Sequence, residues 1–125
     1  MSEVKVSVII PVYNTENYVE ETIKSVLAQS LKEIEVICIN DGSTDGSLEI
    51  LRKYEGLDSR VRVFDRENQG QGAERNFGLH AAAGEYVYFL DSDDLLDEHA
   101  LEMMYKEVQT AREDVLIING QTFYD

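Results

Sequence analysis

The sequence is poor in several residue types, and each shortage excludes a class of protein. It contains one cysteine, one proline and no tryptophan among 125 residues. The lone Cys38 cannot form an intramolecular disulfide, which is typical of a reducing compartment, and its neighbours in "VICIN" indicate a small buried apolar residue. The 11 Lys and Arg are outnumbered by 25 Asp and Glu, and this net charge of -14 is unsuited to binding nucleic acid through its phosphates. A run of about 18 apolar residues is also missing, so we expect no membrane span.

Length and the first residues bear on domain number and location. A chain of 125 residues can build one hydrophobic core, so we expect a single domain over 1–125. The N-terminal "MSEVK" leads directly into a strand pattern and lacks the shape of a signal peptide. We therefore expect a cytoplasmic protein. Peripheral binding at the inner face of the membrane, through a segment outside this chain, stays open.

Strand and helix patterns alternate along the chain. Apolar, β-branched stretches predict strands at 4–12, 35–40, 60–65, 86–90 and 115–123. Helical patterns between them include one that starts with a capping box of Asn17 and Glu20, one through Leu48, Leu51 and Tyr54, one at 73–83 ended by Gly84, and one at 98–112. This order is typical of an α/β domain with a mostly parallel central sheet flanked by helices. We expect its core to contain Val8, Ile10, Val36, Ile37, Ile39, Val61, Val63, Val87 and Phe89.

Polar segments follow each of the first four predicted strands. In chain order they are "PVYNTEN", "NDGSTD", "ENQGQGAERN" and "DSDD". Ligands of open α/β sheets bind outside the carboxyl ends of the strands, where these segments are expected to meet. The sequence therefore predicts a ligand site for a nucleotide and its phosphates at this edge.

The first two segments offer groups suited to a nucleoside. Tyr13 can stack on or border a base, and the Asn14 amide provides both a donor and an acceptor. Asp41 is a pure acceptor, suited to the N–H of a base or the hydroxyls of a ribose. Gly42 and the small Ser43 allow close approach of the backbone.

The last two segments offer groups suited to a metal ion and a diphosphate. Asp91, Asp93 and Asp94 repel one another unless a divalent cation neutralises them. On an extended segment Asp91 and Asp93 would project to the same side and share Mg²⁺ or Mn²⁺, which would bridge them to the diphosphate. Arg75 could reach the same diphosphate from the start of its helix.

Each motif also has a structural interpretation when it is taken alone. Aspartates after a strand commonly cap helices and form turns. Tyr13 could pack on the first helix, and an exposed Arg such as Arg75 commonly pairs with a neighbouring acid. The joint occurrence of these motifs at four successive strand ends favours the nucleotide site.

Four stretches together resemble a known family. "VSVIIPVYNTENYVEETIKSVLAQSL", "EVICINDGSTDGSLEIL", "ENQGQGAERNFGL" and "GEYVYFLDSDD" are similar to the N-terminal half of a family 2 glycosyltransferase with the GT-A fold, a Rossmann-like α/β domain. The resemblance implies a nucleotide-sugar donor site, usually for a UDP-sugar, and synthesis of cell-surface polysaccharide or glycoconjugate. The positions implied at the nucleotide-sugar are Pro11, Tyr13, Asn14, Glu16, Asp41, Gly42, Ser43, Arg75, Asp91 and Ser92.

Specific roles follow from the same resemblance. Asp41 would bond the base, Arg75 would lie near the diphosphate, and Asp91 with Asp93 would form the D-x-D pair that contacts the ribose and the metal. Asn40 stands where many relatives have a second Asp, a departure that leaves Asp41 in place. The family's inverting reaction needs a carboxylate base that would lie beyond Asp125, together with most of the acceptor surface. The acceptor could be a sugar, a lipid-linked saccharide or a protein.

Two alternatives remain at this stage. Without the base, the chain could be a stand-alone module that binds a nucleotide and does not turn it over, instead of part of a longer transferase. A phosphohydrolase of the haloacid dehalogenase type also sets a D-x-D pair after an apolar strand, with Asp91 as nucleophile and Asp93 as acid. That class expects the pair on its first strand, whereas here the pair follows the fourth. A further expectation is a homodimer through the sheet edge at 115–123.

Overall fold

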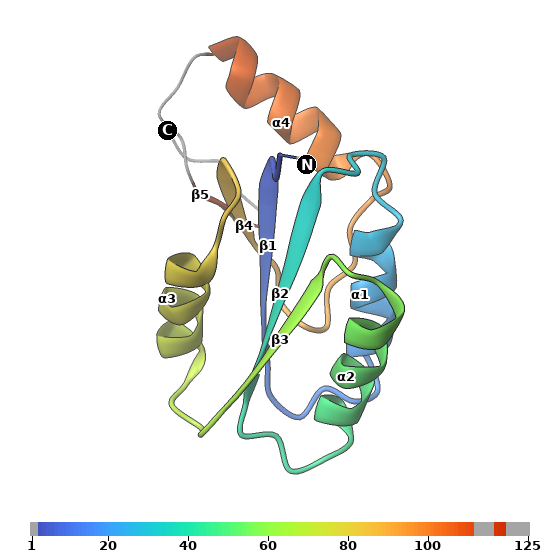
Figure 1. Ribbon diagram of the computed structural model, residues 1–125, viewed down its shortest axis with the longest axis vertical. Helices are drawn as coiled ribbons and strands as arrows, with labels where there is room; N and C mark the ends of the chain where they lie inside the picture. The colour runs from blue at the N-terminus through green and yellow to red at the C-terminus, as the bar shows by residue number, and fades with distance from the viewer. Residues whose placement is uncertain (1–2, 112–116, 120–125) are drawn as a thin grey trace.

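The computed structural model describes residues 3–111 and 117–119, which form one twisted sheet covered by helices (Figure 1). The strands are β1 (Val6–Val12), β2 (Ile34–Asp41), β3 (Val61–Arg66), β4 (Tyr86–Phe89) and β5 (Ile117–Asn119). The helices are α1 (Val19–Leu27), α2 (Ser47–Leu57), α3 (Gln71–Ala81) and α4 (Ala100–Ala111). The sheet order is β3-β2-β1-β4-β5, and each described pairing is parallel. The predicted α/β class with a parallel sheet is confirmed.

Helices cover both faces of the sheet, and the central strands β1 and β2 are buried along their whole length. α1 and α2 lie on one face and α3 on the other (Figure 1). The larger core cluster joins Val8 and Ile10 of β1 to apolar residues of α1, α2 and α4, and includes Cys38. The smaller cluster joins Ile9 and Ile37 to α3. Such two-sided burial explains why the central strands are continuous apolar runs and not alternating ones.

The predicted core is confirmed with one exception. Phe89 is only half-buried, whereas the other eight predicted core residues are buried. Phe89 is the last residue of β4 and belongs to the face that α3 covers. Cys38 is buried as expected, and desolvation raises the pKa of its thiol to about 12, so it is no nucleophile.

The predicted capping box of α1 is wrong. The N-cap position is Tyr18, which makes no side-chain capping bond, and the Thr15 carbonyl accepts the N–H groups of Tyr18 and Val19 at 2.9 Å each. The Glu20 carboxylate instead accepts hydrogen bonds from α2, from the Tyr54 hydroxyl at 2.7 Å and from Lys53 at 3.0 Å. A bond between two helices has replaced the local one that the spacing indicated.

Gly84 does not end a helix, contrary to the prediction. α3 ends at Ala81, and its C-cap is Ala82. Gly84 lies against β1, where an added Cβ would be 2.6 Å from the Ser7 hydroxyl oxygen. Glycine is needed there for close packing, because a side chain would collide with Ser7.

Two further predictions concern a membrane span and the last strand. Among the described residues, no helix is both long and apolar enough to cross a bilayer. Of the strand predicted at 115–123, the described residues form β5, which pairs with β4 at the edge of the sheet. The rest of that prediction lies outside the described residues, and the homodimer stays a prediction.

Candidate functional site

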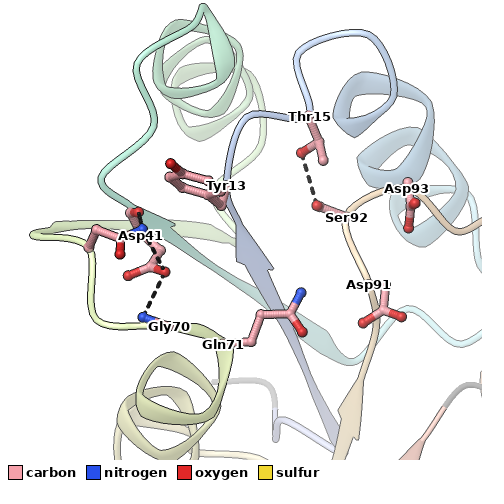
Figure 2. Close-up of a pocket in the computed structure, with 9 residues that line it drawn as sticks. Tyr13, Thr15, Asp41, Gly70, Gln71, Asp91, Ser92 and Asp93 are labelled. Carbon is pink, nitrogen blue, oxygen red and sulfur yellow. Dashed lines mark hydrogen bonds between the residues drawn. The ribbon is translucent and has the colours of Figure 1, made fainter.

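A cavity of about 430 Å³ lies at the carboxyl edge of the sheet (Figure 2). The last residue of β2 and the segments that follow β1, β3 and β4 all contribute to its wall, as the strand-end argument predicts. The lining residues are Tyr13, Thr15, Asp41, Asn68, Gly70, Gln71, Asp91, Ser92 and Asp93. Five of them are predicted site residues, namely Tyr13, Asp41, Asp91, Ser92 and Asp93.

The cavity has two chemically different sides. Tyr13 and Asp41 lie on one side, and Asp91 and Asp93 lie on the other (Figure 2). The Tyr13 side chain is 48% exposed, so an aromatic surface is open to a ligand. A planar group can therefore lie beside Tyr13 while an anionic group bound to a cation lies near the aspartates.

Asp41 supports the loop between β3 and α3. Its Oδ1 accepts the Gln69 N–H at 2.7 Å, its Oδ2 accepts the Gly70 N–H at 3.0 Å, and its carbonyl accepts the Asn68 amide at 3.0 Å. Gly42 has a φ of 71°, and an added Cβ there would be 2.8 Å from the backbone nitrogen of Asn68. The close approach that Gly42 permits is thus to this loop, which forms part of the cavity wall.

Asn14, Glu16 and Ser43 connect two loops and do not line the cavity. The Asn14 N–H donates to Ser43 Oγ at 3.0 Å, and Asn14 Oδ1 accepts the Thr44 N–H at 2.8 Å. The Glu16 carboxylate accepts the Gly46 N–H at 3.3 Å. Pro11 is buried inside β1. Their nucleotide contacts stay predictions, and in the structure three of these residues join the β1–α1 loop to the β2–α2 loop.

The aspartates after β4 are brought together by a turn, not by the extended segment that was predicted. The Asp94 N–H donates to the Asp91 carbonyl at 3.1 Å, which closes the turn. Carboxylate oxygens of Asp91, Asp93 and Asp94 lie within 4.8 Å of one another, and all three residues are exposed. Desolvation, and then the charges of Asp91 and Asp93, raise the pKa of Asp94. The turn concentrates negative charge where a cation would relieve it.

Ser92, between the two aspartates, is held from both sides. Its hydroxyl bonds Thr15 Oγ1 at 2.9 Å (Figure 2), and its carbonyl accepts the Thr22 hydroxyl at 2.9 Å. Thr22 is buried on α1 among Val19, Ile23 and Val26. Sequence reasoning missed Thr22, although a threonine on an otherwise apolar helical stripe is a signal that a polar partner lies across the interface.

Arg75 does not line the cavity but contacts Asp91, which does. Its guanidinium is 3.4 Å from Asp91 Oδ1, and both side chains are about half exposed. α3 thus places a cation beside Asp91, and the contact of Arg75 with a diphosphate stays a prediction.

Comparison with known sequences decides the family. The family model described as "Glycosyl transferase family 2" matches residues 7–125, nearly the whole chain. The chain belongs to this family. The match to glycosyl transferase family 2 gives no support to the phosphohydrolase alternative. That class expects its D-x-D pair after the first strand, whereas here the pair follows β4.

Similar proteins carry glycosyltransferase names. The chain is 43% identical to glycosyltransferase GlyG and 40% identical to glycosyltransferase GlyA, both of Streptococcus pneumoniae serotype 4, over 95% of its length in each case. It spans only 40% of GlyG and 17% of GlyA. The chain therefore corresponds to less than half of the curated relatives that it matches.

Solved structures agree with the fold. S. aureus TarS 1-349 in complex with UDP-GlcNAc superposes with a TM-score of 0.81 at 36% identity, covering 89% of this chain and 33% of that one. The mannosyltransferase PcManGT of Pyrobaculum calidifontis, in complex with GDP-Man and Mn²⁺, superposes with a TM-score of 0.76 at 24% identity, covering 92% and 34%. The predicted GT-A fold is confirmed.

Proposed function

We propose that this domain binds the nucleotide-sugar donor of a glycosyltransferase, and that the donor is a UDP-sugar. The observation that carries the proposal is the cavity that joins Tyr13 and Asp41 on one side to Asp91 and Asp93 on the other. The base would lie against Tyr13 with its N–H on Asp41, and the diphosphate would extend toward the aspartates and Arg75. The UDP-GlcNAc complex of TarS, at 36% identity, supports a uridine nucleotide.

The aspartates fit a divalent cation, and we propose Mg²⁺ or Mn²⁺. Mg²⁺ lies about 2.0 to 2.1 Å from each oxygen ligand, so two ligands on one ion are at most about 4.2 Å apart. The carboxylate oxygens, within 4.8 Å of one another, are close to this spacing, and small side-chain rotations would bring them onto one ion. Asp93 and Asp91 would hold the ion, with Asp94 beside them. The cation would neutralise charge on the departing nucleotide. Arg75 would add a second positive charge on the diphosphate.

The transfer step belongs to a longer protein in this proposal. We propose that the sugar passes to an acceptor hydroxyl with inversion, aided by a carboxylate base beyond Asp125, in the synthesis of cell-surface polysaccharide or glycoconjugate. The chain covers only a small part of the length of its relatives, which supports a division with the donor site in this domain and the acceptor site elsewhere. A sugar, a lipid-linked saccharide and a protein all remain candidate acceptors.

Calorimetric titration of the chain with UDP, with and without Mn²⁺, tests the proposal. We expect UDP to bind more tightly with the metal, and GDP, the comparison ligand, to bind more weakly. Absence of UDP binding under both conditions would refute a donor site formed by these residues alone. Equal UDP affinity with and without metal would refute the metal assignment but leave the proposed nucleotide site in place.

A further inference from the structure

Glu74 is a buried carboxyl group that does not line the cavity. Its side chain, on α3, is 0% exposed. Oε1 accepts a hydrogen bond from Arg66 Nε at 2.7 Å, whereas Oε2 is buried without a hydrogen-bond partner. A buried carboxylate oxygen left unsatisfied is costly, so this atom needs a physical explanation.

The charged groups that face Glu74, within the described residues, come from two strands. Asp41 of β2 and Arg66 of β3 are register partners in the sheet. Ile39, two residues before Asp41, packs in the cluster under α3, so Asp41 points to the same face. The Arg66 guanidinium forms its ion pair with Glu74, and the neighbouring Arg75 is directed to Asp91.

The two carboxyl groups have different surroundings. Asp41 accepts the N–H groups of Gln69 and Gly70, which suits an ionised carboxylate. Glu74 accepts one bond, from Arg66. Burial raises the pKa of Glu74, the Asp41 carboxylate raises it further, and Arg66 opposes both. A single proton shared by the pair would therefore reside on Glu74.

We propose that Glu74 is a positioning residue of the nucleotide site, which keeps its proton and donates Oε2–H to the Asp41 carboxylate. This bond satisfies Oε2 and removes the second negative charge, so that a single negative charge, on Asp41, remains in this buried group. Asp41 is then held in the arrangement that supports Gln69 and Gly70 at the cavity wall. The inference rests on the proposed function, because Asp41 is the group assigned to the base.

Loss of the proton has a defined consequence. Ionised Glu74 would place a second negative charge against Asp41 in a buried setting, and Oε2 would again lack a partner. Asp41 and the backbone of Gln69 and Gly70 would shift to relieve the repulsion. Affinity for the nucleotide falls as the pH rises through the pKa of Glu74.

The variant Glu74→Gln separates the proton from the shape of the side chain. Glutamine retains an oxygen for Arg66 and supplies an N–H to Asp41, but it does not titrate. In the ligand-free chain, amide chemical shifts of Gln69 and Gly70 are followed by NMR against pH. In the wild type we expect a titration step that Glu74→Gln lacks, whereas Glu21→Gln, which removes one exposed acid on α1, retains it. Identical curves in the wild type and Glu74→Gln overturn the proposal.

The nucleotide readout is the ratio of UDP affinities of Glu74→Gln and the wild type, measured over the same pH range with Mg²⁺. The ratio cancels the titration of UDP itself. It should rise with pH by about fivefold or more, at the low end of coupling between linked sites, while the Glu21→Gln ratio stays constant. A constant Glu74→Gln ratio overturns the positioning role. If the wild type binds no UDP, the proposed function fails, and the NMR titration still decides whether Glu74 donates to Asp41.

Discussion

Tyr13 is the aromatic residue of the cavity wall, and its ring is about half exposed. Stacking of a base on this exposed aromatic face is favourable, because it buries apolar surface of both rings. We expect Tyr13→Ala to weaken nucleoside binding by about 1 to 3 kcal/mol, the usual size of a base–aromatic contact. Calorimetry with UDP measures the loss, and Tyr13→Phe, which keeps the ring, should bind nearly as the wild type does. Unaltered affinity in Tyr13→Ala would make Tyr13 a packing residue.

Asp93 is the residue on which the metal assignment depends most directly. Its side chain is exposed and lies in the cluster with Asp91 and Asp94. Asp93→Ala should therefore keep the fold and lose the part of UDP affinity that Mn²⁺ adds. Glu98→Ala is a matched control, since it removes one nearby exposed acid outside the cluster. A metal effect that persists in Asp93→Ala would contradict the assignment.

Among the elements, α1 does more than cover the sheet, because its polar residues hold the segment after β4. The Thr22 hydroxyl donates to the Ser92 carbonyl, and the Ser25 hydroxyl accepts the Leu96 N–H at 3.1 Å. These contacts fix the aspartate turn relative to α1. The position of the turn is thus a property of a helix about 70 residues earlier in the chain.

Thr22→Val tests this role of α1. Valine has the shape of threonine but leaves the Ser92 carbonyl without its donor, which should cost about 1 to 3 kcal/mol of stability. The same change should reduce the metal-dependent part of UDP affinity more than the metal-free part. Thr22→Ser keeps the hydroxyl and should retain the metal effect. Thermal unfolding and calorimetry measure both quantities, and equal losses with and without metal would show that the bond is structural only.

Sequence could predict the elements and the strand-end segments because both depend on local patterns. Parallel strands direct their carboxyl ends to one edge, so Tyr13, Asp41 and Asp91 were expected to meet. Thr22 and Glu74 could not be found in this way. The partner of Thr22 is 70 residues away in the sequence. Glu74 is a charged residue on a weakly amphipathic helix, so it would be expected at the surface, yet packing against the sheet buries it. The predicted start of α1 and end of α3 were wrong for the same reason. Glu20 and Gly84 contact residues of other elements and do not cap a helix.

For the whole molecule, the net charge of -14 and the raised pKa values of Glu74 and Asp94 act in the same direction as the pH falls. Self-repulsion destabilises a compact chain far from its isoelectric point, which here is about 4.4. Desolvation and neighbouring carboxylates raise the pKa values of Glu74 and Asp94, so the stability they provide is complete at low pH and is lost as the pH rises through those values. Both effects favour mildly acidic conditions over alkaline ones.

Other acids limit that gain at lower pH. Burial alone would raise the pKa of Glu35, but hydrogen bonds from Ser7, Ala83 and Arg62 outweigh it and the net shift is downward. Arg60 likewise lowers the pKa of Asp58. The stability that Glu35 and Asp58 provide is present above their unfolded pKa values and is lost as the pH falls through the lowered ones. Acid unfolding should therefore begin below the ordinary range of carboxyl groups.

The melting temperature should consequently rise as the pH is lowered from about 8 to about 5, and fall again at lower pH. Calorimetric scans measure this curve, and added salt should flatten its alkaline side because exposed charges are screened beyond about 10 Å at 0.1 M ionic strength. Glu35→Gln should lower the melting temperature most at neutral pH and least in acid, where the wild-type carboxylate is itself protonated. A melting temperature that falls steadily from pH 8 to pH 5 would mean that the ionised network around Glu35 outweighs the repulsion among the acids of the whole chain.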